Sequence, residues 1–179
     1  MKIETARLLL EPVSYELLTA AAKQDKEEIA RLGYRSDGEW PGKDFLEAIP
    51  YFQAEWHRKK GTRGFDSWIF VDKNTKDILG GIGFTGDADD AGWIEIGFAT
   101  NPSKQRCGYC REAAKGLMDW AFSQAEIAGI RACSEINNKA SAGLLRTLGF
   151  SQEGQQEDLF LWKITKSDFF VAKDLADIV

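Results

Sequence analysis

The stretch that decides the fold is WIEIGFATNPSKQRCGYCREA, residues 93–113. In its first part apolar residues alternate with Glu95 and Gly97, which is the pattern of a strand with one buried and one open face. An Asn-Pro-Ser turn then ends the strand. From about Gly108 onward, apolar residues recur at helical spacing. Residues 105–110 therefore join the end of a strand to the beginning of a helix.

The rest of the chain supplies strands and helices around this junction. Alternation and turn residues predict strands, while apolar spacings of three and four predict helices. The expected strands are residues 6–13, 68–71, 78–84, 93–99, 130–136 and 159–164, and the expected helices are residues 15–32, 44–58, 108–122 and 138–148. Pro50 is expected to kink or split the second helix. This order predicts an α/β (α+β) fold with a mixed sheet, in one domain spanning residues 1–179.

The composition is that of an ordinary globular protein and excludes several classes of function. Of the 179 residues, 44% are hydrophobic and 28% are charged, and the formal net charge is −5. Because the basic residues are scattered among acids, we expect no nucleic-acid partner. No apolar run reaches the roughly 18 residues of a membrane span, so we expect no membrane partner. Three cysteines, an odd number, fit a reducing compartment, and we expect a cytoplasmic protein.

Cys107 and Cys110 form a Cys-x-x-Cys pair that has two possible chemical uses. A thioredoxin-like dithiol works beside a later cis-proline, but no proline follows this pair in the sequence. A zinc site needs two more ligands, and the only candidates are Cys133 and His57, without supporting spacing. We therefore expect neither a metal nor a redox function. The helix N-terminus is nevertheless expected to lower the pKa of either thiol.

The same loop is also a candidate anion site. A loop that opens a helix presents unpaired N–H groups, and the helix dipole adds partial positive charge. Gly108 permits close approach of the backbone to a ligand, and Lys104, Arg106 and Arg111 add local charge. A single glycine is weak evidence for this function.

A wider pattern supports the anion site. The run IEIGFATNP, then QRCGYCREA, then NKAS and LGF further on, resembles the GNAT family of acetyl-CoA-dependent N-acetyltransferases. Within that family it is similar to the RimJ/RimL-type branch, which acetylates ribosomal-protein N-termini, and ETARLLLEPV near the N-terminus resembles the first strand of that branch. The resemblance implies a single GNAT-like domain with a mostly antiparallel central sheet.

The resemblance also implies the site residues. The loop Gln105, Arg106, Cys107, Gly108, Tyr109 and Cys110 would hold the coenzyme A pyrophosphate through its backbone amides. The strand Gly97, Phe98, Ala99 and Thr100 would pair with the pantetheine arm, and Asn138 would bond to the same arm. Asn138 has a second interpretation as a helix N-cap. Cys110 stands where the family usually has Gly or Ala, which a buried thiol can replace.

The resemblance implies direct attack of an amine on the acetyl thioester in a ternary complex. Glu95 would act as general base, and a backbone N–H near Phe98 would hold the carbonyl oxygen. Many relatives have a tyrosine where this sequence has Leu145, so Ser141 is the candidate for stabilising or protonating the thiolate. A solvent-facing strand residue is the alternative for Glu95. The candidates for lining the acceptor entrance are Trp40, Trp56, Asp87, Asp89 and Asp90, although aromatic residues at helical spacing are more often core and acids in a turn are usually solvated.

The predicted activity is N-acetylation of a primary amine, either a peptide or protein N-terminus or a small amine, with acetyl-CoA as cosubstrate and no metal. Two alternatives stay open. One is a catalytically silent acyl-CoA-binding module, and the other is the thiol redox or zinc protein. A monomer and a homodimer are both compatible with the sequence.

Overall fold

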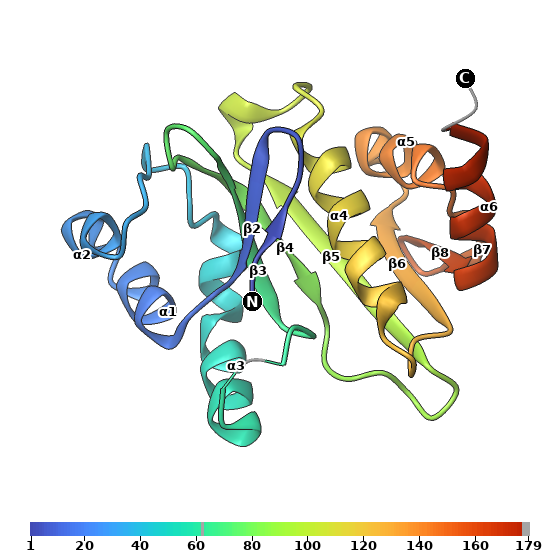
Figure 1. Ribbon diagram of the computed structural model, residues 1–179, viewed down its shortest axis with the longest axis horizontal. Helices are drawn as coiled ribbons and strands as arrows, with labels where there is room; N and C mark the ends of the chain where they lie inside the picture. Colours follow the sequence, from blue (N-terminus) through green and yellow to red (C-terminus); the bar gives the residue numbers. More distant parts are fainter. Residues whose placement is uncertain (62, 177–179) are drawn as a thin grey trace. The chain divides into compact units, whose positions relative to one another are not determined.

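Two compact units make up the protein. The computed structural model describes residues 1–61 and 63–176. Unit one comprises Met1–Gly83 and Phe98–Leu117, and unit two comprises Phe84–Gly97 and the chain from Met118 onward. Figure 1 shows the elements of both units along the chain.

Unit one contains an antiparallel set of strands and three helices. The strands β1 (Ile3–Glu4), β2 (Leu8–Pro12), β3 (Ser67–Asp72) and β4 (Ile78–Phe84) pair in this order. The helices α1 (Tyr15–Ala22), α2 (Lys26–Arg31) and α3 (Lys43–Lys59) lie between β2 and β3 in the sequence, and α1 and α3 lie side by side (Figure 1). Four successive residues of β3, 68–71, are buried, as expected for a strand with both faces covered.

Unit two is built on β6 (Gly129–Glu135), which pairs antiparallel with β8 (Leu159–Thr165), which in turn pairs antiparallel with β7 (Ser151–Gln156). Its helices are α5 (Lys139–Thr147) and α6 (Lys166–Ala176). Alternate residues of β6 are buried and exposed, so one face of this sheet packs into the core and the other is open.

Two elements pass through both units. They are β5 (Trp93–Thr100) and α4 (Tyr109–Ser123), and the short 3-10 helix η1 (Pro102–Lys104) lies between them in the sequence. The strand order of the sheet is β1-β2-β3-β4-β5-β6-β8-β7, and β5 pairs with β6 in parallel. The predicted α/β fold with a mixed, mostly antiparallel sheet flanked by helices is confirmed.

The structure corrects the first predicted helix. Residues 15–32 form two helices instead of one, because the chain turns at Gln24 with φ of 53° and Asp25 begins a new helix. The carboxylate of Asp25 accepts a hydrogen bond from the N–H of Glu28 (3.0 Å), which is an N-cap. Periodicity continued across the break, so it did not reveal the cap.

Pro50 does not split α3, which contains it and runs on to Lys59. A proline inside a helix costs about 3 kcal/mol, but Phe45, Ile49 and Phe52 pack into or against the core of unit one and offset this cost. Beyond β8, α6 was not predicted as a helix. Its Phe169 is buried and its ring centroid lies 5.1 Å from that of Phe122. Among the described residues, no helix is long and apolar enough to cross a membrane.

Candidate functional site

The segment after β5 is fixed at its start by Asn101. The side-chain Nδ2 of Asn101 donates to the carbonyl oxygen of Ile78 (2.9 Å), and its backbone N–H donates to the carbonyl oxygen of Leu79 (2.9 Å). Asn101 is only 5% exposed, so water competes little for these bonds. The strand-to-helix junction predicted from the sequence therefore begins at a well-held point of unit one.

The loop of residues 105–110 contains two left-handed backbone positions. Arg106 has a φ of 60° and Gly108 a φ of 77°. A Cβ at Gly108 would lie 3.4 Å from Nη2 of Arg7, which is tight but not prohibitive, so the positive φ is the stronger reason for glycine. Turns with left-handed positions present successive N–H groups to a common ligand and bind anions.

The N–H groups of this loop are available for such a ligand. Within residues 1–61 and 63–176, the backbone N–H groups of residues 106–111 donate no hydrogen bond. The N–H of Glu112 donates to the carbonyl oxygen of Gly108 (3.1 Å) and begins the ladder of α4. Six consecutive free donors at a helix N-terminus, where the dipole is positive, are complementary to an anion.

Arg7, near the N-terminus, contacts two residues of this loop. Its Nη1 donates to the carbonyl oxygen of Cys107 (3.0 Å), and its guanidinium carbon lies 4.5 Å from the ring centroid of Tyr109. A planar guanidinium can hydrogen-bond at its edge and stack on its face at the same time. Arg7 therefore fixes two residues of the loop.

Glu112 anchors Arg7 in turn. One carboxylate oxygen accepts from the backbone N–H of Arg7 (2.7 Å) and from Oγ1 of Thr5 (2.6 Å), and the other accepts from Nε of Arg7 (2.7 Å). Partial burial acts to raise the pKa of Glu112, but the hydrogen bonds from Thr5 and Arg7 outweigh burial and hold this pKa below its ordinary value. The first turn of α4 and the N-terminal segment are thus joined by a charged, hydrogen-bonded group.

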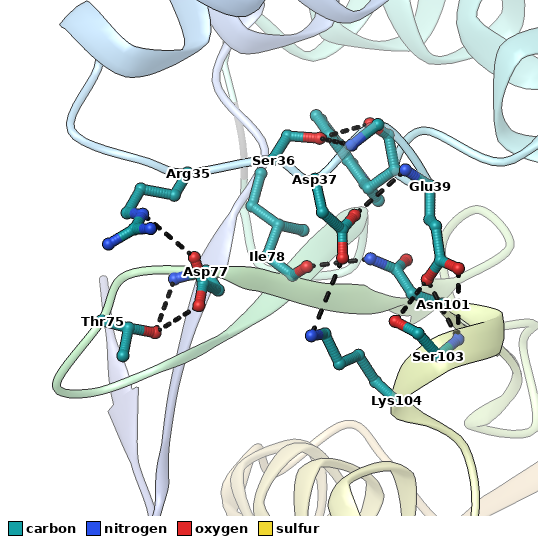
Figure 2. A network of polar contacts seen from close by, with 12 residues as sticks. Arg35, Ser36, Asp37, Glu39, Thr75, Asp77, Ile78, Asn101, Ser103 and Lys104 are labelled. Carbon is teal, nitrogen blue, oxygen red and sulfur yellow. Dashed lines mark hydrogen bonds and ion pairs between the residues drawn. The ribbon is translucent and has the colours of Figure 1, made fainter.

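A second contact holds η1, directly before the loop (Figure 2). The carboxylate of Glu39 accepts from the backbone N–H of Ser103 (3.0 Å) and from its Oγ (2.7 Å). The carboxylate of Asp37 lies 3.7 Å from Nζ of Lys104. Both acids precede α3 in the sequence, and their contacts with Ser103 and Lys104, drawn in Figure 2, show that this segment lies against η1. In that segment Trp40 is 4% exposed and belongs to the core of unit one, so it does not line an open entrance.

The two cysteines of the loop differ. Cys107 is exposed, whereas burial raises the pKa of Cys110 to about 11, opposed by a hydrogen bond with Thr100. The prediction that the helix N-terminus lowers the pKa of either thiol is wrong for Cys110, because desolvation outweighs the dipole. No group of three or more His, Cys, Asp or Glu side chains in the described residues could hold a metal ion.

In unit two, the pairing between β5 and β6 ends at Glu95. Their parallel pairing joins Trp93 to Gly129, Ile94 to Ile130 and Glu95 to Arg131, and both strands continue beyond these pairs. A Cβ on Gly97 would meet nothing within 4 Å. Within unit two, the backbone of Ile96 and Gly97 thus has no register partner on β6.

Glu95 itself is exposed and points to the open face, as its alternation with buried Ile94 and Ile96 predicted. In the described part of the chain its carboxylate makes no hydrogen bond and no ion pair.

Asn138 is the N-cap of α5. Its Oδ1 accepts from the backbone N–H of Ser141 (3.0 Å), which confirms the N-cap interpretation. The hydroxyl of Ser141 is half-buried and makes no hydrogen bond to any residue that the structure describes. Leu145 is fully buried and belongs to the core.

The predicted residues therefore divide between the units. Unit one contains Phe98, Ala99, Thr100 and the whole loop 105–110, and unit two contains Glu95, Gly97, Asn138 and Ser141. The sequence did not reveal Arg7, Glu39 or Glu112 as supports of the loop. Arg7 and Glu112 are 105 residues apart in the sequence, and no spacing rule links residues so distant.

Comparison with known proteins identifies the family. A model of the acetyltransferase (GNAT) domain matches residues 7–151. A Bacillus subtilis (strain 168) protein described as uncharacterized N-acetyltransferase YjdG is 51% identical over 148 residues, which are 83% of this chain and 88% of that protein. A second protein of that strain, uncharacterized N-acetyltransferase YoaA, is 29% identical over 85% of this chain and 84% of its own length.

Solved structures share the fold. The ribosomal-protein-S5-alanine acetyltransferase from Vibrio fischeri aligns with a TM-score of 0.68 at 18% identity, over 94% of this chain and 98% of that one. The spermidine/spermine N-acetyltransferase SpeG from Vibrio cholerae aligns with a TM-score of 0.60 at 15% identity, over 71% and 79%. The chain belongs to the GNAT acetyltransferase family. The match to a ribosomal-protein enzyme, at this identity, establishes the fold and not the RimJ/RimL branch.

Proposed function

We propose that this protein transfers the acetyl group of acetyl-CoA to a primary amine by direct attack in a ternary complex. The observation that carries the proposal is the row of six backbone N–H groups at residues 106–111, which donate to no residue that the structure describes, lead into α4 and are held by Arg7. A pyrophosphate needs such donors, and it needs no lysine-rich surface when they are present.

The residues present fit coenzyme A. The amides of residues 106–110 would hold the pyrophosphate, with Gln105 beginning the loop, and the backbone of β5 at Gly97–Thr100 would bond to the pantetheine amides as a neighbouring strand does. Asn138 uses Oδ1 in capping α5, so its Nδ2 group is the one that would donate to the pantetheine arm. When bound, the coenzyme supplies an activated acetyl thioester.

Three groups of the protein would carry the reaction. Glu95 accepts the proton that the ammonium must lose before its nitrogen can attack, directly or through a water molecule. The backbone N–H of Phe98 donates to the carbonyl oxygen as negative charge develops on it. Ser141 would donate a hydrogen bond to the sulfur as the bond between sulfur and the acetyl carbon breaks, since its hydroxyl is bonded to no residue that the structure describes.

The acceptor class and the wider assignments belong to the same proposal. Named structural neighbours include a ribosomal-protein-alanine enzyme and a spermidine/spermine enzyme, so a protein N-terminus and a small amine are both reasonable acceptors. We place the protein in the cytoplasm and treat residues 1–179 as one GNAT domain without a metal.

A silent acyl-CoA-binding module is the second candidate. It is favoured by the buried Leu145 at the position where many relatives have a tyrosine. Such a module would bind acetyl-CoA but release no coenzyme A thiol with any amine.

Calorimetric titration with acetyl-CoA and a thiol-release assay over a panel of amines and N-terminal peptides test the proposal. Gly108→Val is expected to abolish coenzyme binding because valine strongly disfavours a φ of 77°. The matched control is Gly42→Ala, since Gly42 has a negative φ and its added Cβ meets nothing within 4 Å. Normal coenzyme binding by folded Gly108→Val would refute the loop assignment.

The proposed chemistry has its own test. Glu95→Gln and Ser141→Ala should bind acetyl-CoA normally and lose turnover, Glu95→Gln by about 100-fold or more. If both variants keep full turnover, the mechanism is wrong even though the family is right.

A further inference from the structure

The open face of unit two carries an ordered row of charges. Glu95 on β5, Arg131 on β6 and Lys163 on β8 are register partners across three neighbouring strands. Residues one position along each strand, such as Ile94 and Ile130, are buried on the opposite face. The row therefore faces away from the core of unit two.

Arg131 is held in one orientation. Its Nη1 donates to a carboxylate oxygen of Asp89 (2.9 Å), and its guanidinium carbon lies 4.9 Å from the ring centroid of Trp93. The Trp93 ring crosses over Gly129, where a Cβ would lie only 2.4 Å from the ring. Glycine at 129 thus lets the ring lie flat enough to support the guanidinium.

Asp89 is itself fixed. It accepts hydrogen bonds from the backbone N–H groups of Trp93 (2.9 Å) and Ala91 (3.0 Å) within the turn before β5. A guanidinium that is both stacked and anchored loses little further rotamer entropy when it binds a ligand.

Glu95 and Arg131 do not neutralise each other. Their strands are adjacent and about 4.8 Å apart, yet among the described residues the two side chains form no ion pair, because Arg131 is directed to Asp89 and Trp93. Lys163 is occupied differently, since it pairs with Glu153. Within the described part of the chain, the open face therefore presents a carboxylate without a hydrogen bond or ion pair and, one strand away, a guanidinium held by Asp89 and Trp93.

The guanidinium keeps donors for a ligand. Arginine has five N–H donors in a planar fork, and Asp89 takes one of them. The fork suits a carboxylate, which it can bind through two parallel hydrogen bonds. Half of the Arg131 side chain is exposed, at 49%, so a ligand can reach it.

We propose that the acceptor is an amine that also carries a carboxylate, with the ammonium at Glu95 and the carboxylate at Arg131. This inference rests on the proposed function, because it takes Glu95 as the group that receives the amine proton. Gly97, on the same face as Glu95, leaves open space where the bound amine lies. Arg131 is then a specificity-determining residue, and Trp93 and Asp89 are positioning residues that hold it.

The test compares matched acceptors that differ only in the carboxylate. Free alanine, aspartate and glutamate are compared with their amides, and peptides beginning with Asp or Glu are compared with those beginning with Asn or Gln. The wild-type protein is expected to prefer the carboxylate of each pair by about tenfold or more in kcat/KM, the size of a charge-assisted bidentate contact. The free amino acids and the peptides distinguish the two sources of the same chemistry.

Variants of Arg131 locate the preference. Arg131→Gln should remove it by raising KM for the carboxylate acceptors, and Arg131→Lys should restore part of it, while acetyl-CoA affinity stays unchanged in both. Lys163→Gln is the matched control, because it removes a neighbouring cation already paired with Glu153, and it should keep the preference. The proposal is overturned if the wild type treats carboxylates and amides alike, or if Arg131→Gln keeps the preference.

A binding measurement separates this inference from the proposed function. Equilibrium dialysis of the preferred radiolabelled amino acid or peptide needs no turnover, and binding should weaken about tenfold or more in folded Arg131→Gln. If acetyl-CoA does not bind but the labelled acceptor does so through Arg131, the proposed function fails and the acceptor site remains. If acetyl-CoA binds and amines without carboxylates are acetylated equally well, the inference fails and the proposed function remains.

Discussion

Glu112→Gln tests how much the charged contact between the first turn of α4 and the N-terminal segment stabilises the fold. The carboxylate of Glu112 accepts three hydrogen bonds, one from Thr5 and two from Arg7, at 2.6–2.7 Å. Its side chain is 17% exposed, whereas that of Arg7 is 47% exposed. Glutamine keeps the shape of the side chain but loses the charge, and it presents an NH2 group toward a donor.

The expected loss follows from these contacts. A hydrogen bond to a charged group contributes about 1.5–3 kcal/mol. Three such bonds share one carboxylate, the exposed guanidinium is screened by water, and glutamine retains one acceptor oxygen. We therefore expect the free energy of unfolding at pH 7 to fall by about 2 kcal/mol.

The loss should depend on pH. Since the pKa of Glu112 is lower in the folded protein than in the unfolded chain, its charge stabilises the fold above the unfolded pKa of about 4.3, and this stabilisation disappears as pH falls through the folded pKa. Urea unfolding of wild type and variant at pH 7, 5 and 3 should show a difference that is full at pH 7 and shrinks toward pH 3.

Glu47→Gln is the matched control, because Glu47 forms only an exposed pair with Lys43 at 3.7 Å. Its effect should stay within about 0.5 kcal/mol at pH 7. An equal loss for Glu112→Gln at pH 7 and pH 3 would show that shape, and not charge, supports the contact, and the reasoning would be refuted.

Three further predictions concern buried and half-buried groups of unit one. Because burial raises the pKa of Cys110 to about 11, Ellman's reagent at pH 8 should modify exposed Cys107 in the native protein much faster than half-buried Cys110. Gly80→Ala should lower the free energy of unfolding by about 3 kcal/mol, since its Cβ would lie 2.3 Å from the carbonyl oxygen of Ala99, as urea titration would measure. Trp40→Phe should change stability in urea by less than about 1 kcal/mol, because removing the buried indole N–H, which has no partner in the described chain, offsets the cavity that the smaller ring leaves.

For each of these three predictions, one result would contradict the reasoning. Rapid native labelling of Cys110, identified by peptide mass, would contradict its burial. The control for Gly80 is Gly154→Ala, where the new Cβ meets nothing within 4 Å, and equal losses for the two would contradict the steric argument. A loss of about 3 kcal/mol for Trp40→Phe would mean that the indole N–H is bonded.

Local patterns predicted much of the fold. The alternation around Glu95 placed it on the open face, and the structure confirms that placement because a strand's side chains alternate whatever packs against it. The apolar periodicity continued across the N-cap at Asp25, so it predicted one helix where there are two. It also did not predict α6. In both cases apolar spacing did not show where a helix begins. The sequence predicted that Pro50 would kink or split the helix, but α3 runs through it. The packing of α3 against the core offsets the cost of the proline, and this packing is a tertiary contribution that local sequence does not show.

In the candidate site, too, local sequence predicted some features and tertiary contacts decided others. The loop 105–110 was predicted because a strand, a glycine and a helix follow one another in the sequence, and the free N–H groups are a direct consequence of that order. The pKa of Cys110 was predicted in the wrong direction, since burial is not visible in the sequence. Arg131 was not predicted as a site residue, because its importance comes from its neighbours Trp93 and Asp89.

The sequence by itself therefore determined the family, the strand-loop-helix junction and the faces on which Glu95 and Gly97 lie, because each depends on residues close together in the chain. Only the tertiary structure decided what holds the junction and what faces Glu95. Arg7 reaches Glu112 across 105 residues, and Arg131 reaches Asp89 across 42. Such contacts form only after the chain has folded, because the attraction between two charges depends on their distance in space and not on their separation in the sequence.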